Sequence, residues 1–114
     1  MAVLQVGVLP NAALAAAAQF HAEVVPKALA NLAGQPSLLA LIFPPADHSH
    51  RAWRLAAIQS LAREFAPVRV NALVSDRENA IAAALFYLET AEGVTGQLLE
   101  LDDTGAGEVL SSPL

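Results

Sequence analysis

The sequence SLLALIF at residues 37–43 is an apolar run that lies between Pro36 and Pro44. A run without polar alternation is typical of a strand covered on both faces, as in a parallel sheet. Two further stretches, VLQVGVL at 3–9 and VRVNALV at 68–74, are rich in apolar and β-branched residues. The first is bounded by Pro10 and predicts a buried strand, and the second predicts another strand. The sequence therefore predicts a parallel sheet at the centre of the domain.

Three helical stretches alternate with these strands. Residues 12–33 are rich in alanine and leucine, and Pro26 inside them predicts a kink. Residues 49–65 form the second predicted helix. The third runs to about Thr90 from the capping box Ser75-Asp76-Arg77-Glu78, in which the serine accepts from the backbone N–H three residues on and the glutamate reaches back.

Residues 97–101 (QLLEL) supply a fourth strand, so the predicted order is β-α-β-α-β-α-β. Alternating strands and helices imply parallel pairing through right-handed crossovers. A chain of 114 residues fits one domain. Residues 102–114 are polar and contain glycine, which predicts a loose tail. We expect one α/β domain with four parallel strands and three helices.

The composition excludes several function classes. The net charge is −5 and the six basic residues are scattered, so we expect no nucleic-acid partner. The absence of cysteine excludes disulfides, thiolate catalysis and zinc–thiolate sites. No apolar run reaches the length of a membrane span, and no basic-flanked leader begins the chain, so a cytoplasmic location is expected. The apolar fraction of 55% exceeds what a small domain readily buries, which favours an oligomer.

The predicted helix at 49–65 has two apolar faces. A helix with two such faces packs against two partners, for example its own sheet and a neighbouring subunit. We therefore predict that one face belongs to an interface. The stripes are Leu55, Ile58, Ala62 and Phe65 on one side, and the predicted interface residues Trp53, Ala57 and Leu61 on the other.

Several short motifs occur along the chain at the spacings found in a known protein family. They are Ser60-Leu61-Ala62-Arg63-Glu64, Ala66-Pro67, Arg69-Val70-Asn71-Ala72, Thr95-Gly96-Gln97 and, more weakly, Leu9-Pro10-Asn11-Ala12-Ala13. Together they resemble the later part of the short-chain dehydrogenase/reductase family. The resemblance implies a truncated Rossmann-like, three-layer fold, oxidoreductase chemistry and an NAD or NADP cofactor. It also implies that the helices at 12–33 and 49–65 pack against a second subunit as a four-helix bundle.

The chain departs from this family at the positions that carry its chemistry. The positions that match the serine, tyrosine and lysine of the family triad are Phe43, Asp47 and Arg51. An aspartate is a poor substitute for a phenolic proton donor, and a guanidinium cannot shuttle protons. The family's Gly-rich pyrophosphate turn has no counterpart in the sequence. We therefore predict no catalytic and no cofactor-binding residues, and no cofactor for the chain alone.

Two further groups of residues permit alternative interpretations. Asp47-His48-Ser49-His50 contains possible metal ligands, but it also has the pattern of a helix start with Asp47 or Ser49 as the N-cap, and we predict no metal site. Asn11 and Asn71 are either site residues or residues that bond the backbone at strand ends.

Three functional hypotheses follow. The first is a non-catalytic, oligomerising short-chain dehydrogenase-like protein, a pseudoenzyme that acts as a structural or regulatory subunit. It would form a homodimer or a hetero-oligomer with another dehydrogenase-like chain. The second is an NAD(P)-dependent oxidoreductase whose cofactor site needs a partner chain. The third is a small-molecule binding module, which a pocket near residues 43–48 and 74–76 would favour.

Overall fold

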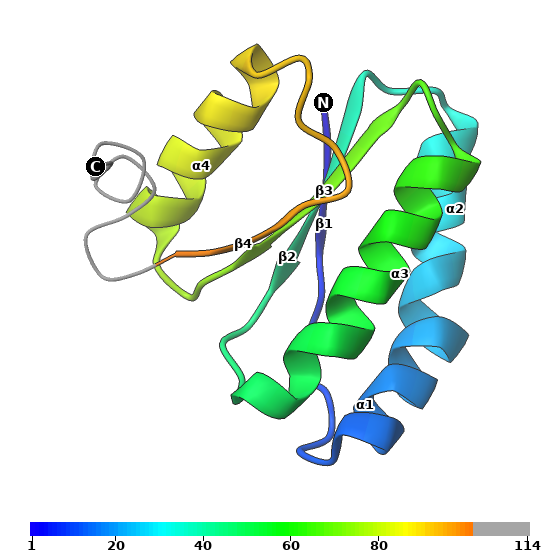
Figure 1. The fold of residues 1–114 in the computed structure, drawn as a ribbon, viewed down its shortest axis with the longest axis vertical. Helices are drawn as coiled ribbons and strands as arrows, with labels where there is room; N and C mark the ends of the chain where they lie inside the picture. The colour runs from blue at the N-terminus through cyan, green and yellow to red at the C-terminus, as the bar shows by residue number, and fades with distance from the viewer. Residues whose placement is uncertain (102–114) are drawn as a thin grey trace.

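A computed structural model describes residues 1–101, in which four parallel strands form one sheet (Figure 1). The strands are β1 (Ala2–Gln5), β2 (Leu38–Phe43), β3 (Arg69–Val74) and β4 (Leu98–Glu100), and they lie side by side in chain order. The predicted α/β class and the four parallel strands are confirmed. The tail predicted at 102–114 lies outside the described residues.

The helices cover the two faces of the sheet unequally (Figure 1). Helices α1 (Ala13–Gln19), α2 (Val25–Ala33) and α3 (Arg51–Glu64) lie on one face, and α4 (Glu78–Thr90) lies on the other. Every residue of β2 is buried, as predicted for a strand covered on both sides. Its alternate side chains enter two separate cores, so the fold has three layers.

Where the sequence predicts a kink near Pro26, the structure has a π-helical turn at Phe20–Val24, between α1 and α2. The Val25 N–H donates to the Phe20 carbonyl, five residues back rather than four. Pro26 has no N–H and its ring crowds the preceding turn, so a wider turn directly before it relieves both problems. The helical segment therefore continues past the proline as far as Ala33.

Strand β1 is shorter and more exposed than predicted. The expected buried strand at 3–9 is instead Ala2–Gln5, with alternating half-buried and exposed residues, and Val3 is 43% exposed. The reason is its place at the edge of the sheet, where only the face under α1 to α3 is covered. Val6 continues the pairing by donating to the Ile42 carbonyl.

The capping box predicted at the start of α4 does not form. Ser75 is buried and still belongs to the sheet, because its N–H donates to the Phe43 carbonyl. Its hydroxyl accepts from Arg77 N at 3.0 Å, two residues on rather than three. The helix begins at Glu78, so a serine in the sheet turns the chain toward the helix without capping it.

Candidate functional site

The three positions that match the family triad lie near the carboxyl ends of the strands. Phe43 is the last residue of β2, and Asp47 and Arg51 flank the short 3-10 turn His48–His50 that begins the α3 segment. The Phe43 ring is fully buried and stacks on Phe20, with the ring centres 5.4 Å apart. Where the family has a serine hydroxyl, this chain therefore has a core aromatic side chain.

The Asp47 carboxylate caps the start of the α3 segment. It accepts a hydrogen bond from Ser49 N at 2.9 Å and another from the Ser49 hydroxyl. These two bonds, the hydroxyl bond first, lower the pKa of this exposed carboxyl below its ordinary value, and a smaller loss of hydration opposes them. The helix-start interpretation of this motif is confirmed with Asp47 as the cap. An ionised acceptor at this position is unsuited to donate a proton.

We expect Asp47→Ala to lower the melting temperature at neutral pH, because Ser49 N loses its partner. The pKa of Asp47 is lower in the folded chain, so its stabilisation is present above its ordinary pKa and is lost as pH falls through the lowered value. Melting curves of both proteins across acidic pH should therefore converge. Asp47→Asn keeps an uncharged cap and serves as the control. A pH-independent gap between wild type and Asp47→Ala would contradict this assignment.

Arg51 is an exposed residue with a surface ion pair. Its Nε lies 3.6 Å from Glu100 Oε1, and the two side chains are 49% and 56% exposed. Such pairs contribute little to stability because water screens them. Arg51 therefore replaces the family lysine with a permanently charged group that is engaged by β4.

Arg54 is a functional candidate that no sequence motif indicates. This residue is only 4% exposed, and its guanidinium carbon lies 4.5 Å from the Phe43 ring centre. Nη1 donates to the Pro44 carbonyl at 3.1 Å, whereas the buried Nε has no partner within residues 1–101. Burial lowers the pKa of Arg54, although a guanidinium remains charged at neutral pH. The sequence does hold a signal, because Arg54 lies between the two apolar stripes of the helix.

His50 connects the start of α3 to the loop after β1. Trp53 Nε1 donates to His50 Nδ1 at 3.2 Å, and His50 Nε2 lies 2.9 Å from the Asn11 carbonyl. An indole N–H can only donate, so the contacts fit a neutral ring with its proton on Nε2. His48 is exposed. Within residues 1–101, no group of three potential metal ligands comes together.

Asn71 holds the chain that returns to β4. Its amide donates to the Val94 carbonyl at 2.9 Å, and its oxygen accepts from Gln97 N at 3.1 Å. Thr95 contributes similarly, since its hydroxyl accepts from Val70 N. The motif residues near Thr95-Gly96-Gln97 thus secure the entry to β4, which favours the backbone-bonding interpretation of Asn71. Asn11 is exposed and follows β1, which is the edge strand opposite β4.

A cavity of about 300 Å³ opens at the carboxyl ends of β1 and β2. It is lined by two loops, residues 8–11 and 44–47, together with His50 and Arg54. The expected pocket near residues 43–48 is therefore present in part. Residues 74–76 do not line it, because the loop after β1 forms its second wall instead.

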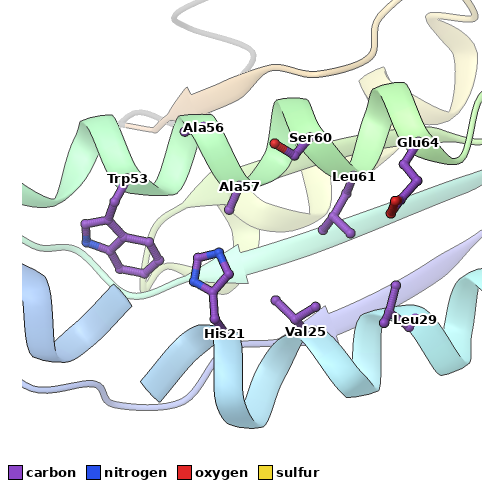
Figure 2. Close-up of a pocket in the computed structure, with 9 residues that line it drawn as sticks. All are labelled: His21, Val25, Leu29, Trp53, Ala56, Ala57, Ser60, Leu61 and Glu64. Atoms are coloured by element: carbon purple, nitrogen blue, oxygen red, sulfur yellow. The ribbon is translucent and has the colours of Figure 1, made fainter. Parts of the chain in front are cut away.

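A second cavity of about 380 Å³ lies between α2 and α3 (Figure 2). Trp53, Ala57 and Leu61 all line it, so the structure brings the three predicted interface residues together. Ala57 and Leu61 are only 7% and 6% exposed, however, because α1 and α2 of the same chain cover much of this helix face. The more exposed lining residues are Ala56, Ser60 and Glu64 on α3 and His21 and Leu29 opposite.

Comparison with known proteins identifies the family. A family model described as short chain dehydrogenase-like protein matches residues 4–101. No curated protein and no solved structure matches the chain. The matched span includes the three motif blocks at 60–72, 95–97 and 9–13 that first indicated this resemblance, and nearly all of the four-stranded sheet. The chain belongs to the short-chain dehydrogenase-like family.

Proposed function

We propose that this chain is a non-catalytic member of its family that acts as an oligomeric structural or regulatory subunit. The environment of Asp47 and Arg51 carries the proposal. Asp47 is engaged by Ser49 and Arg51 by Glu100, while Phe43 is part of the core. These positions supply no hydroxyl, phenol or ammonium where the family chemistry would use them.

We expect such a subunit in the cytoplasm. Among residues 1–101, no helix has the length and apolar character needed to span a membrane.

The apolar groove between α2 and α3 supports the oligomeric part of the proposal (Figure 2). Val25 and Leu29 line one side, and Ala57 and Leu61 form its floor from the other. Leu29 is 40% exposed. A second copy of the chain, or another dehydrogenase-like chain, would cover this face by packing its own helices across the groove.

Light scattering tests the proposal directly. We expect a dimer or larger assembly for the wild type, and monomers for Ala56→Arg with Ser60→Arg, because two charged side chains would be buried without partners. Both positions are exposed on the rim of the groove, so the fold is spared. Gln59→Arg, exposed on the same helix but outside the groove, is the matched control. A monomeric wild type would overturn the oligomer.

We also expect the chain alone to bind neither NADH nor NADPH at micromolar concentration. The cavity at the strand ends is about 300 Å³, which is small for a dinucleotide. The loop after β1 has a single glycine, Gly7, so it is not a Gly-rich pyrophosphate-binding turn. Titration calorimetry is the measurement. A micromolar Kd would instead support the alternative, an NAD(P)-dependent oxidoreductase, and binding only after mixing with another dehydrogenase-like chain would show that a partner completes the cofactor site.

A further inference from the structure

The charge of Arg54 is buried and has no ion-pair partner among residues 1–101. Within residues 1–101 no carboxylate lies within salt-bridge distance of its guanidinium, and Glu100, the acid whose charge acts favourably on Arg54, pairs with Arg51. A buried cation without a counter-charge is costly, and native proteins generally retain one only where something compensates it. Arg54 therefore requires an explanation that the family resemblance does not provide.

The surroundings of Arg54 hold its guanidinium in one orientation. Its carbon lies 4.5 Å from the Phe43 ring centre and 5.8 Å from that of Trp53. Nη1 is occupied by the Pro44 carbonyl. The opposite edge, Nε with Nη2, makes no hydrogen bond within the described chain. Arginine commonly uses this edge to bind a carboxylate through two parallel hydrogen bonds.

The cavity of about 300 Å³ at the ends of β1 and β2 is lined by this residue. Ligands of open parallel sheets commonly bind in this region, outside the carboxyl ends of the strands. The walls combine apolar and polar groups: Val8, Leu9 and three prolines, with Asn11 beside them. The Asn11 side chain makes no hydrogen bond within residues 1–101 and can serve as a second donor.

We propose that this cavity binds a small organic carboxylate, which pairs with the Arg54 guanidinium and lays its apolar part against the prolines. A monoanion fits better than phosphate. Arg54 is the only cation in the lining, both His50 nitrogens are engaged, and the Asp47 carboxylate also lines the cavity. A divalent anion would face that carboxylate with a single positive charge to hold it.

The sole tryptophan of the chain, Trp53, provides a reporter beside Arg54. The full chain is titrated with butyrate, with butyramide as the neutral analogue and with inorganic phosphate, at constant ionic strength. We expect a saturable fluorescence change with butyrate, at least tenfold weaker with butyramide and with phosphate. Butyrate should also raise the melting temperature of the wild type.

Three variants separate binding from folding. Arg54→Met should abolish the butyrate response while keeping the melting temperature of the unliganded chain, since an apolar replacement of a buried charge is often neutral. Arg54→Lys should weaken binding at least tenfold, because an ammonium lacks the two-pronged edge. Arg63→Met, an exposed arginine on the same helix, is the control. The proposal is overturned if butyrate gives no saturable change, if Arg54→Met responds equally, or if phosphate binds and butyrate does not.

Discussion

Phe43→Ala should destabilise the folded chain by about 3–5 kcal/mol, the range typical of a buried phenylalanine. The ring is fully buried, stacks on Phe20 and contacts Trp53 edge to face, with centres 6.0 Å apart. Its removal leaves a cavity and also removes the aromatic ring against which the Arg54 guanidinium packs. Urea denaturation followed by circular dichroism measures the loss.

Phe86→Ala is the matched control for this experiment. Phe86 is 70% exposed on α4, so its truncation should change the free energy of unfolding by no more than about 0.5 kcal/mol. Equal losses in the two variants would contradict the placement of Phe43 in the core. Phe43→Ser, which introduces the residue typical of the family, should destabilise the chain at least as much as alanine. In this chain, position 43 therefore serves core packing.

Leu61→Asp should have a comparable or larger effect, about 4 kcal/mol or more, because it places an unpaired charge in the core. Leu61 is 6% exposed and belongs to the larger of the two hydrophobic clusters. The short aspartate cannot extend its carboxylate to the opening of the groove. Since small domains are stable by about 5–15 kcal/mol, much of the protein would unfold. Thermal denaturation by circular dichroism is the measurement.

Gln59→Asp is the control, on the same helix and exposed. It should shift the melting temperature only slightly, and a shift as large as that of Leu61→Asp would contradict the burial of Leu61. The comparison also guides the choice of interface variants. A substitution at Leu61 that abolishes the oligomer would report unfolding, so the groove is better tested at Ala56 and Ser60.

The elements of the sheet could be predicted from sequence because each strand is a short apolar run. Continuous runs such as residues 38–43 are covered on both faces in the structure. The edge strand β1 was predicted too long, because its apolar composition does not reveal that one of its faces lacks a covering helix. Ser75 was predicted to be a helix cap because its spacing to Glu78 is correct, whereas its N–H is still used by the sheet.

The candidate site could be predicted only in part. The cap at Asp47 depends on neighbouring residues, and the local pattern was sufficient. The burial and contacts of Arg54 depend on Phe43 and Pro44, which lie on a strand and a loop and are distant in the sequence. The second apolar stripe of α3 indicated a neighbour correctly, but periodicity cannot distinguish a helix of the same chain from one of a second subunit.

The π-turn at Phe20–Val24 acts as a one-residue insertion in an otherwise regular helical register. The buried residues on either side of it are Ala16, Phe20, Ala28 and Leu32, spaced four, eight and four apart. In an unbroken α-helix, with about 100° of rotation per residue, steps of four, eight and four would place Leu32 about 160° around the helix from Ala16. With one residue absorbed by the wider turn, the spacing becomes equivalent to four, seven and four, which is a single continuous stripe.

This register links the extra residue to Pro26. Removal of one exposed residue from the turn, such as Glu23, would leave the stripe intact but would return the proline to an ordinary α-helical turn, where its ring clashes with a carbonyl. Relatives that lack the extra residue should therefore also lack the proline. We expect the extra residue and the proline to be gained or lost together.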